Sequence, residues 1–171
     1  MIDLMEVHNL IGTDAILPVM KEWKQGGRIR YIGVTTSSTG SHGALMEIMR
    51  REPLDFIQVS YSIGARDAAE GVLPLAQYRG MAMLLNVPFG GRRGSVFGTL
   101  ADKELPEWAS EFDCTSWAQF CLKYLVSHPA GTCSFPGTTD PEHLADNLGA
   151  AGGRLPDPAL RERMAQLFDS F

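Results

Sequence analysis

Polar side chains stand inside or just beyond five apolar, β-branched segments of the 171-residue sequence. In parallel α/β folds the carboxyl ends of the strands meet at one edge of the sheet, and ligands bind there. A polar group that is buried without a partner costs free energy, so several of them at one edge favour a site for a polar ligand. In chain order the candidates are Glu6, His8 and Asn9, then Thr35 and Thr36, then Gln58, Ser60 and Ser62, then Asn86, and then Ser134 and Thr138.

His8 is the candidate best suited to acid–base chemistry, because an imidazole can polarise a carbonyl or relay a proton near neutral pH. A core histidine satisfied by backbone groups explains the same position, so both interpretations stay open. Glu6 alternates in phase with His8 and is either its partner or a plain residue of a core layer. Gln58 suits stacking against a planar ring or pairing with an amide, although a lone glutamine is more often structural.

Two glycine-containing loops could bind an anion. The segment 137–142, GTTDPE, places a glycine turn and two hydroxyls before a helix, where unpaired N–H groups and the helix dipole bind phosphate; an ordinary capping box from Thr139 to Glu142 is the alternative. The segment 90–94, GGRRG, is either a loop that closes over an anionic ligand or a solvated loop. No Ser/His/Asp order, Walker glycine loop or H-E-x-x-H motif occurs.

The composition is that of a globular domain, with 44% hydrophobic and 20% charged residues. This excludes a disordered chain, a collagen-like repeat and a disulfide scaffold. Lys and Arg number 15 against 20 for Asp and Glu, a net charge of -5, which speaks against a nucleic-acid partner. Cys114, Cys121 and Cys133 form no C-x-x-C pair, so we expect reduced core thiols and no metal site.

No uninterrupted apolar stretch reaches the roughly 18 residues that a membrane helix needs. The first ten residues, MIDLMEVHNL, lack the basic region and the cleavage site of a signal peptide. We therefore expect a cytoplasmic protein that has no membrane partner.

The apolar segments read as parallel strands separated by helices. The first four begin at residues 2, 29, 56 and 82, a period of 26 to 27 residues that fits one strand and one helix. We predict strands at 2–8, 29–35, 56–62, 82–87 and 132–135, and helices at 15–25, 44–51 and 69–79.

The remainder of the chain is predicted to be helical after a long irregular connection. That connection, 90–114, is the kind of loop that carries function. A helix follows whose aromatic face includes Trp117 and Phe120. Two further helices, 141–148 and 158–168, each begin with Asp-Pro, an N-cap residue followed by proline at the first helical position.

Five strands in 171 residues predict a single α/β domain over 1–171 that is part of a (β/α)8 TIM barrel. A whole barrel takes about 250 residues and rarely fewer than about 200. A first strand at residue 2 suggests a truncated chain that starts in mid-fold. The open sheet leaves an unpaired edge, so we expect a homo-oligomer formed through it.

Several motifs resemble the aldo-keto reductase family, in the order in which that family has them. They run from residue 2 to about 149: IDLMEVHN, GRIRYIGVTT, PLDFIQVSYSIGAR, LPLAQYRGMAMLLNVPFGG, SWAQFCLKYLVSHPA and PGTTDPEHLADNLGA. The resemblance implies an NAD(P)H-dependent oxidoreductase on a (β/α)8 barrel. Such an enzyme reduces an aldehyde or ketone, a small-molecule carbonyl substrate, by hydride transfer.

The resemblance also assigns roles to residues of this sequence. His8 corresponds to the active-site histidine that contacts the substrate carbonyl. Thr35 and Thr36 take the place of a Ser-Asn pair that, with Gln58, holds the nicotinamide carboxamide. Asn86 stands where many members stack an aromatic ring on the nicotinamide. Pro88, Phe89 and Gly90 match the loop along the pyrophosphate, and Thr138, His143, Asp146 and Asn147 match the segment that receives the adenosine end.

The sequence departs from the family in its cations and in its catalytic tetrad. NADPH is the expected cofactor, but Gly137 and His143 replace a common Lys and Arg, so NADH is the alternative. Only His8 of the family's Asp, Tyr, Lys and His is present, and the missing general acid is worth roughly 10²–10⁴-fold in rate. We expect no activity from this chain alone. The alternatives are an inactive truncated homologue that binds cofactor or serves as a structural or oligomerising module, and a different barrel chemistry built on His8.

Overall fold

The computed structural model describes residues 1–91 and 95–171. The chain divides into two compact units, which are treated separately below. Unit 1 comprises Met1–Ser60 and Asp67–Leu84, and unit 2 comprises Tyr61–Arg66 and Leu85–Phe171. The strands follow one another in the sheet in chain order, from β1 to β5. The prediction of a single domain over 1–171 stays a prediction.

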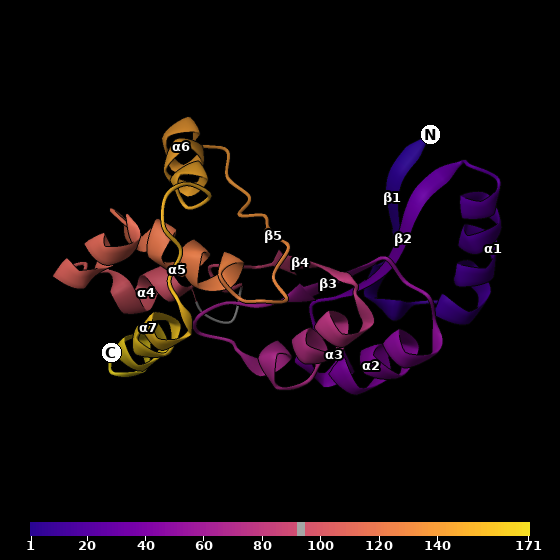
Figure 1. Cartoon of the computed structure of the whole chain (residues 1–171), viewed down its shortest axis with the longest axis horizontal. Helices are drawn as coiled ribbons and strands as arrows, with labels where there is room; N and C mark the ends of the chain where they lie inside the picture. The colour runs from indigo at the N-terminus through magenta and orange to yellow at the C-terminus, as the bar shows by residue number, and fades with distance from the viewer. Residues whose placement is uncertain (92–94) are drawn as a thin grey trace. The chain divides into compact units, whose positions relative to one another are not determined.

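Unit 1 alternates strands and helices (Figure 1). The pairings of β1 with β2 and of β2 with β3 are parallel, as expected. Every predicted element of this unit exists, and its ends lie within a few residues of the expected ones. The strands are β1 (Ile2–Val7), β2 (Ile29–Thr36), β3 (Phe56–Ser60) and most of β4 (Ala82–Asn86), and the helices are α1 (Thr13–Gln25), α2 (His42–Arg51) and α3 (Val72–Arg79).

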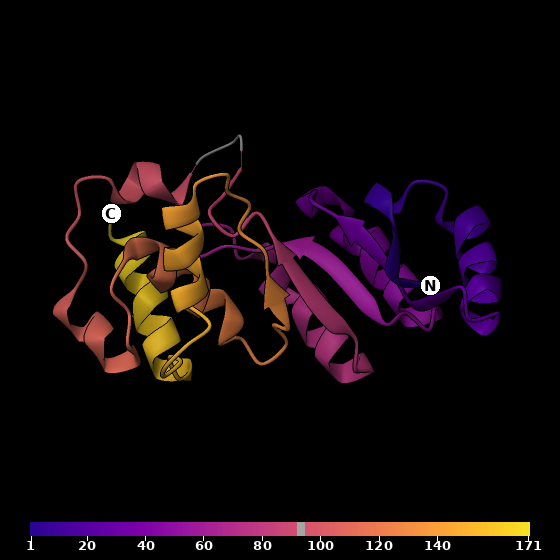
Figure 2. The same cartoon turned by 90° about the horizontal axis from the view of Figure 1, so that it is seen from above.

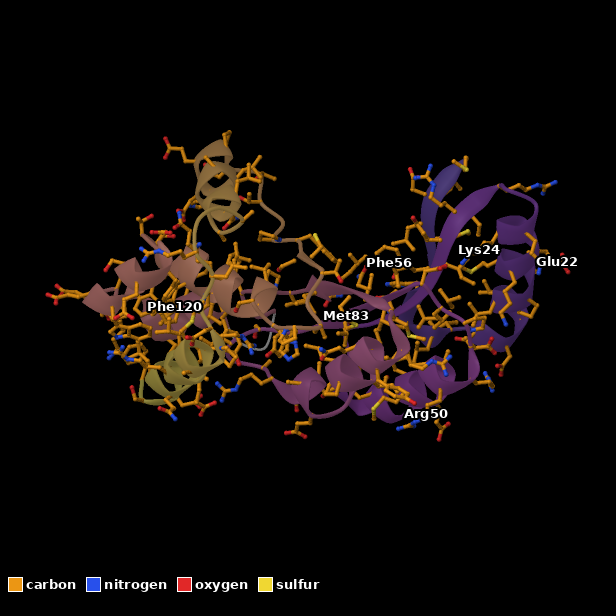
Figure 3. All side chains as sticks on the ribbon, viewed as in Figure 1. Glu22, Lys24, Arg50, Phe56, Met83 and Phe120 are labelled. Atoms are coloured by element: carbon orange, nitrogen blue, oxygen red, sulfur yellow. The ribbon has the colours of Figure 1, made fainter. Side chains whose placement is uncertain are left out.

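The core of unit 1 lies between one face of its strands and its helices. Val34 and Ile57 are fully buried on that face, and Leu17 and Leu45 meet it from α1 and α2. Each such side chain contributes about 1.5–3 kcal/mol when it is fully buried. Met83 of β4 is buried as well (Figure 3). The opposite face carries the aromatic pair of Tyr31 and Phe56 and, nearer the carboxyl ends of the strands, polar residues.

A salt bridge fixes α1 against the strands. Lys24 Nζ donates to both carboxylate oxygens of Asp55, at 2.7 and 2.6 Å, and Asp55 Oδ2 also accepts the backbone N–H of Ile32 at 2.8 Å. Figure 3 shows Lys24 turned toward the strands and Glu22 on the outer side of the same helix. One carboxylate therefore joins the end of α1 to β2.

Unit 2 is mainly helical, and it contains the end of β4 beside β5 (Figure 2). The region 90–114 was expected to be irregular, and that expectation is wrong in part. Helices of five or six residues are too short to show a period of 3.6, so the sequence pattern missed them. The elements are β5 (Cys133–Ser134), α4 (Val96–Leu100), the 3-10 helix η4 (Glu107–Phe112), α5 (Trp117–Val126), α6 (Pro141–Gly149) and α7 (Pro158–Asp169).

Helix α5 forms the centre of unit 2. Phe120 is fully buried (Figure 3), and its ring lies 5.7 Å from Trp108 and 5.1 Å from Trp117 in edge-to-face geometry. Lys123 is also fully buried, and its ammonium donates to the backbone carbonyls of Gly152 and Arg154 at 2.6 and 2.9 Å. These contacts attach the segment between α6 and α7 to α5.

The two Asp-Pro helix starts are confirmed. The carboxylate of Asp140 accepts the N–H groups of Glu142 and His143, and the carboxylate of Asp157 accepts that of Leu160. Because Asp140 is the N-cap, the alternative of a capping box beginning at Thr139 is wrong.

The cysteine prediction holds for two residues and fails for the third. Cys114 and Cys121 are buried thiols, whereas Cys133 is exposed because it lies on the two-residue strand at the end of the sheet order. Association through that edge stays a prediction.

Among residues 1–91 and 95–171, no helix has the length and apolarity to cross a membrane, and no cluster of His, Cys, Asp or Glu has the geometry of a metal site.

Candidate functional site

Three polar residues meet at the carboxyl ends of the strands of unit 1. Thr35 is the register partner of Gln58, so the two side chains share a face of the sheet. Val7 pairs with Val34, which places His8 at the level of Thr35 on the neighbouring strand. Within the described chain, neither the Thr35 hydroxyl nor the Gln58 amide makes a hydrogen bond. We call His8, Thr35 and Gln58 the strand-end group.

Thr36 has a different role from its neighbour. Its Oγ1 accepts the backbone N–H of Ser38 at 3.1 Å, and the side chain is buried. Such a bond stabilises the turn that follows β2. Both threonines are buried, and of the two only the Thr36 hydroxyl has a hydrogen-bond partner within the described residues.

The turn that follows β1 and begins at His8 has an unusual backbone conformation. Asn9 and Leu10 both have positive φ angles, 53° and 58°, which cost about 1–3 kcal/mol each for non-glycine residues. Strain of this kind concentrates at functional sites. His8 itself is exposed in the described chain, which argues against the interpretation of a core histidine.

Glu6 is a half-buried carboxyl on the strand that leads to His8. It pairs in register with Gly33, and a Cβ on that glycine would lie 2.9 Å from Glu6 Oε1. Glu6 Oε1 is buried and has no hydrogen-bond partner in the part of the chain that the structure describes. Burial therefore raises the pKa of Glu6 to about 7. No hydrogen bond joins Glu6 to His8 within the described residues, so the interpretation as its partner gains no support.

A Glu6→Gln variant should show a stability difference that depends on pH. Because the pKa is raised from 4.5 to about 7, Glu6 contributes stability below pH 4.5 and loses it as the pH rises through 7. Discounted for partial exposure, the variant should be more stable than the parent by about 1 kcal/mol at pH 8 and equal to it at pH 4. Urea denaturation at both pH values measures this. A difference independent of pH would contradict it.

Unit 2 contains a cleft between α5 and α6 with a volume of about 460 Å³. The sequence named half of the residues that line it, and it missed Phe97 and Trp117. Phe97 lies in the short α4, and the sequence places Trp117 on the aromatic face of a helix without a role in binding. The lining residues are Phe89, Phe97, Ser116, Trp117, Ala118, Gly137, Thr138, His143, Asp146 and Asn147, and we call this space the α5–α6 cleft.

Asp146 ties the two helices of the cleft together. Its carboxylate accepts the Ser116 hydroxyl and the Gln119 side-chain amide, both at 2.7 Å. Ser116 is itself the N-cap of α5, because its Oγ accepts the Gln119 backbone N–H at 3.1 Å. The position of α6 against α5, and with it the width of the cleft, depends on this network.

The turn after β4 is the second strained turn at a strand end. Val87, a β-branched residue, has a φ of 54°, and its carbonyl accepts the N–H of Gly90 at 3.0 Å. Asn86 and Pro88 are buried, and they do not line the α5–α6 cleft, nor does Gly90. Arg92 and Arg93, proposed from the sequence to close over an anion, lie outside the described residues.

The chain matches known proteins over most of its length. The family model "Aldo/keto reductase family" matches residues 1–162. A probable aldo-keto reductase 1 of Glycine max is 23% identical over 191 aligned residues, covering 94% of this chain and 54% of the relative.

Solved structures of similar proteins have the same fold. The thermostable aldo-keto reductase Tm1743, in complex with the inhibitor epalrestat, superposes with a TM-score of 0.69 at 28% identity over 98% of this chain and 59% of that chain. An aldo-keto reductase from Klebsiella pneumoniae in complex with NADP and acetate gives a TM-score of 0.71 at 19% identity, over 97% of this chain and 58% of that chain.

The chain therefore spans about half to three fifths of the length of these relatives. The architecture is an α/β fold of five strands alternating with helices, part of the (β/α)8 barrel of these structures, as the strand period predicts.

Proposed function

The chain belongs to the aldo/keto reductase family, and from that premise we propose that it binds a nicotinamide adenine dinucleotide for the reduction of an aldehyde or ketone. The observation that carries the proposal is the α5–α6 cleft. Phe89, Thr138, His143, Asp146 and Asn147 were named from the sequence as contacts of the dinucleotide, and all five line it.

The chemistry of the α5–α6 cleft fits the adenosine end of a dinucleotide. Its volume of about 460 Å³ is in the range of small-molecule sites. Phe89 and Phe97, with ring centroids 4.9 Å apart, and Trp117 offer flat apolar surfaces to a purine. Thr138 and Asn147 offer a hydroxyl and an amide to ribose hydroxyls.

The strand-end group fits the two other roles of the family's site, which are to hold the nicotinamide carboxamide and to contact the substrate carbonyl. The unpaired Thr35 hydroxyl and Gln58 amide match the donors and acceptors of a carboxamide. His8, exposed at the end of β1, is proposed to donate a hydrogen bond to the substrate carbonyl oxygen. The dinucleotide, when bound, supplies the hydride. A relative crystallised with NADP supports this choice of cofactor.

We propose that the chain alone binds cofactor but turns over little substrate. His8 is the one member of the family's Asp, Tyr, Lys and His set that the 171 residues contain. Without a tyrosine as general acid, the rate should fall roughly 10²–10⁴-fold below that of a complete site. The test is carbonyl-dependent oxidation of reduced cofactor, and full turnover by the pure chain would contradict this part of the proposal.

Titration of NADPH and NADH into the pure chain, followed by fluorescence, tests the binding. We expect micromolar affinity for at least one cofactor, and Asn147→Ala and Gln58→Ala should each weaken it about tenfold, since one lost hydrogen bond is worth about 1.4 kcal/mol. Gln166→Ala and Gln77→Ala, on exposed helix faces, are the matched controls and should have no effect. Absence of binding at millimolar cofactor would favour a structural module instead.

A further inference from the structure

The α5–α6 cleft has an unusual charge balance for a site that binds a phosphorylated ligand. Among its described lining residues, no Lys or Arg occurs, and the ionisable side chains are Asp146 and His143. The donors to the Asp146 carboxylate are a serine hydroxyl and a glutamine amide, which are both neutral. No ion pair offsets the charge of that carboxylate within the part of the chain that the structure describes.

The start of α6 adds further negative charge beside the cleft, next to the lining residue His143. Asp140 Oδ1 accepts the N–H groups of Glu142 at 2.8 Å and His143 at 3.4 Å. These are the backbone donors that a phosphate at a helix N-terminus would use, and here the chain's own carboxylate occupies them. Glu142 brings a second carboxylate to the first turn. His143 Nδ1 lies 3.9 Å from Asp140 Oδ2, so the Asp140 carboxylate stands beside a residue that lines the cleft.

We infer that the α5–α6 cleft selects an adenosine without an additional phosphate, so that the chain prefers NADH to NADPH. The two cofactors differ by one phosphate monoester on the adenosine ribose, which is close to a dianion at neutral pH. Among the described lining residues that group meets the Asp146 carboxylate and no Lys or Arg, and the Asp140 carboxylate stands beside His143 at the start of α6. A ribose hydroxyl, by contrast, can donate to Asp146 or pair with Asn147. The inference rests on the proposed function, and it reverses the preference that the family resemblance implies.

The experiment compares four probes on the full chain by titration calorimetry: NADH, NADPH, adenosine 5′-monophosphate and adenosine 2′,5′-bisphosphate. The two adenosine nucleotides report on the cleft without the nicotinamide end. We expect the compound with the additional phosphate to bind at least tenfold more weakly in each pair. The ratio of the two dissociation constants in each pair should shrink as the salt concentration is raised, because the repulsion is between charges near the surface.

Substitutions at the start of α6 test the cause. Asp140→Ser keeps an N-cap residue and removes the charge, and His143→Arg adds a permanent cation. Each should reduce the ratio several-fold, and together they should bring it to one or below. Asp157→Ser is the matched control, because it makes the same change at the N-cap of α7, which does not line the cleft.

The outcomes separate the two proposals. Equal or tighter binding of NADPH and of the bisphosphate by the unmodified chain overturns the inference and leaves the proposed function standing. A ratio that Asp157→Ser changes as much as Asp140→Ser overturns the assigned cause. Absence of binding for all four probes overturns the proposed function and the inference with it.

Discussion

An Asp146→Ala variant is expected to lose about 3 kcal/mol of its free energy of unfolding, together with measurable nucleotide binding. The carboxylate accepts hydrogen bonds from Ser116 and Gln119, each at 2.7 Å. Hydrogen bonds to a charged group are worth about 1.5–3 kcal/mol each, and the buried Gln119 amide would be left without a partner. Because α6 is fixed to α5 through this residue, its loss also widens the α5–α6 cleft.

Urea denaturation and an NADH titration measure the two effects together. Asp146→Asn keeps one carbonyl acceptor and should lose about 1 kcal/mol. Asp102→Ala, at an exposed position of unit 2, is the matched control and should change stability by less than about 0.5 kcal/mol. The role given to the network is wrong if Asp146→Ala behaves like Asp102→Ala in both measurements.

A Gly33→Ala variant is expected to lose about 3 kcal/mol of stability through unit 1. A Cβ at this position would lie 2.5 Å from the backbone oxygen of Phe56 and 2.9 Å from Glu6 Oε1. The Glu6 side chain can move, but the Phe56 oxygen belongs to β3, which is held in register with β2. The strands must therefore separate locally, and overpacking of this kind typically costs 1–3 kcal/mol, with the upper end expected for a backbone clash.

Two further variants identify the cause of that loss. Gly43→Ala has nothing within 4 Å of its Cβ and lies in α2, so it should be neutral or stabilising by about 0.5 kcal/mol. Adding Glu6→Ala to Gly33→Ala should recover little, since the shorter contact is with the backbone. Full recovery in the double variant would assign the effect to the carboxyl instead. Thermal unfolding of all variants provides the measurement.

The strand period shows how far local pattern predicts this protein. Strands begin at residues 2, 29, 56 and 82, as predicted. Within each strand every second side chain points to the same face, so apolar residues such as Val34 in β2 and Ile57 in β3 reach the buried face together. The helix starts at Pro141 and Pro158 were also predicted, since the Asp-Pro signal depends on neighbouring residues alone.

Short elements and the roles of single side chains were missed, because they leave no repeating pattern in the sequence or depend on contacts between distant segments. The helices α4 and η4 are too short to carry a period. Cysteine is a residue type that is usually buried, and Cys133 is exposed because it lies on the last strand of the sheet. Thr35 and Thr36 are the same residue type, and they differ because the Thr36 hydroxyl accepts the backbone N–H of Ser38 in the turn. Trp117 joins the cleft because α6 packs beside its helix.

The sequence by itself determined the fold class and the order of the elements, because hydrophobic period and capping act over a few neighbouring positions. The residues proposed to bind the cofactor were named from the family resemblance. The tertiary structure alone decided how those residues work. Ser116 and Asp146 are 30 residues apart, and only packing makes them partners. Likewise, the raised pKa of Glu6 and the unbalanced charge at α6 arise from burial and proximity, which depend on contacts between distant segments.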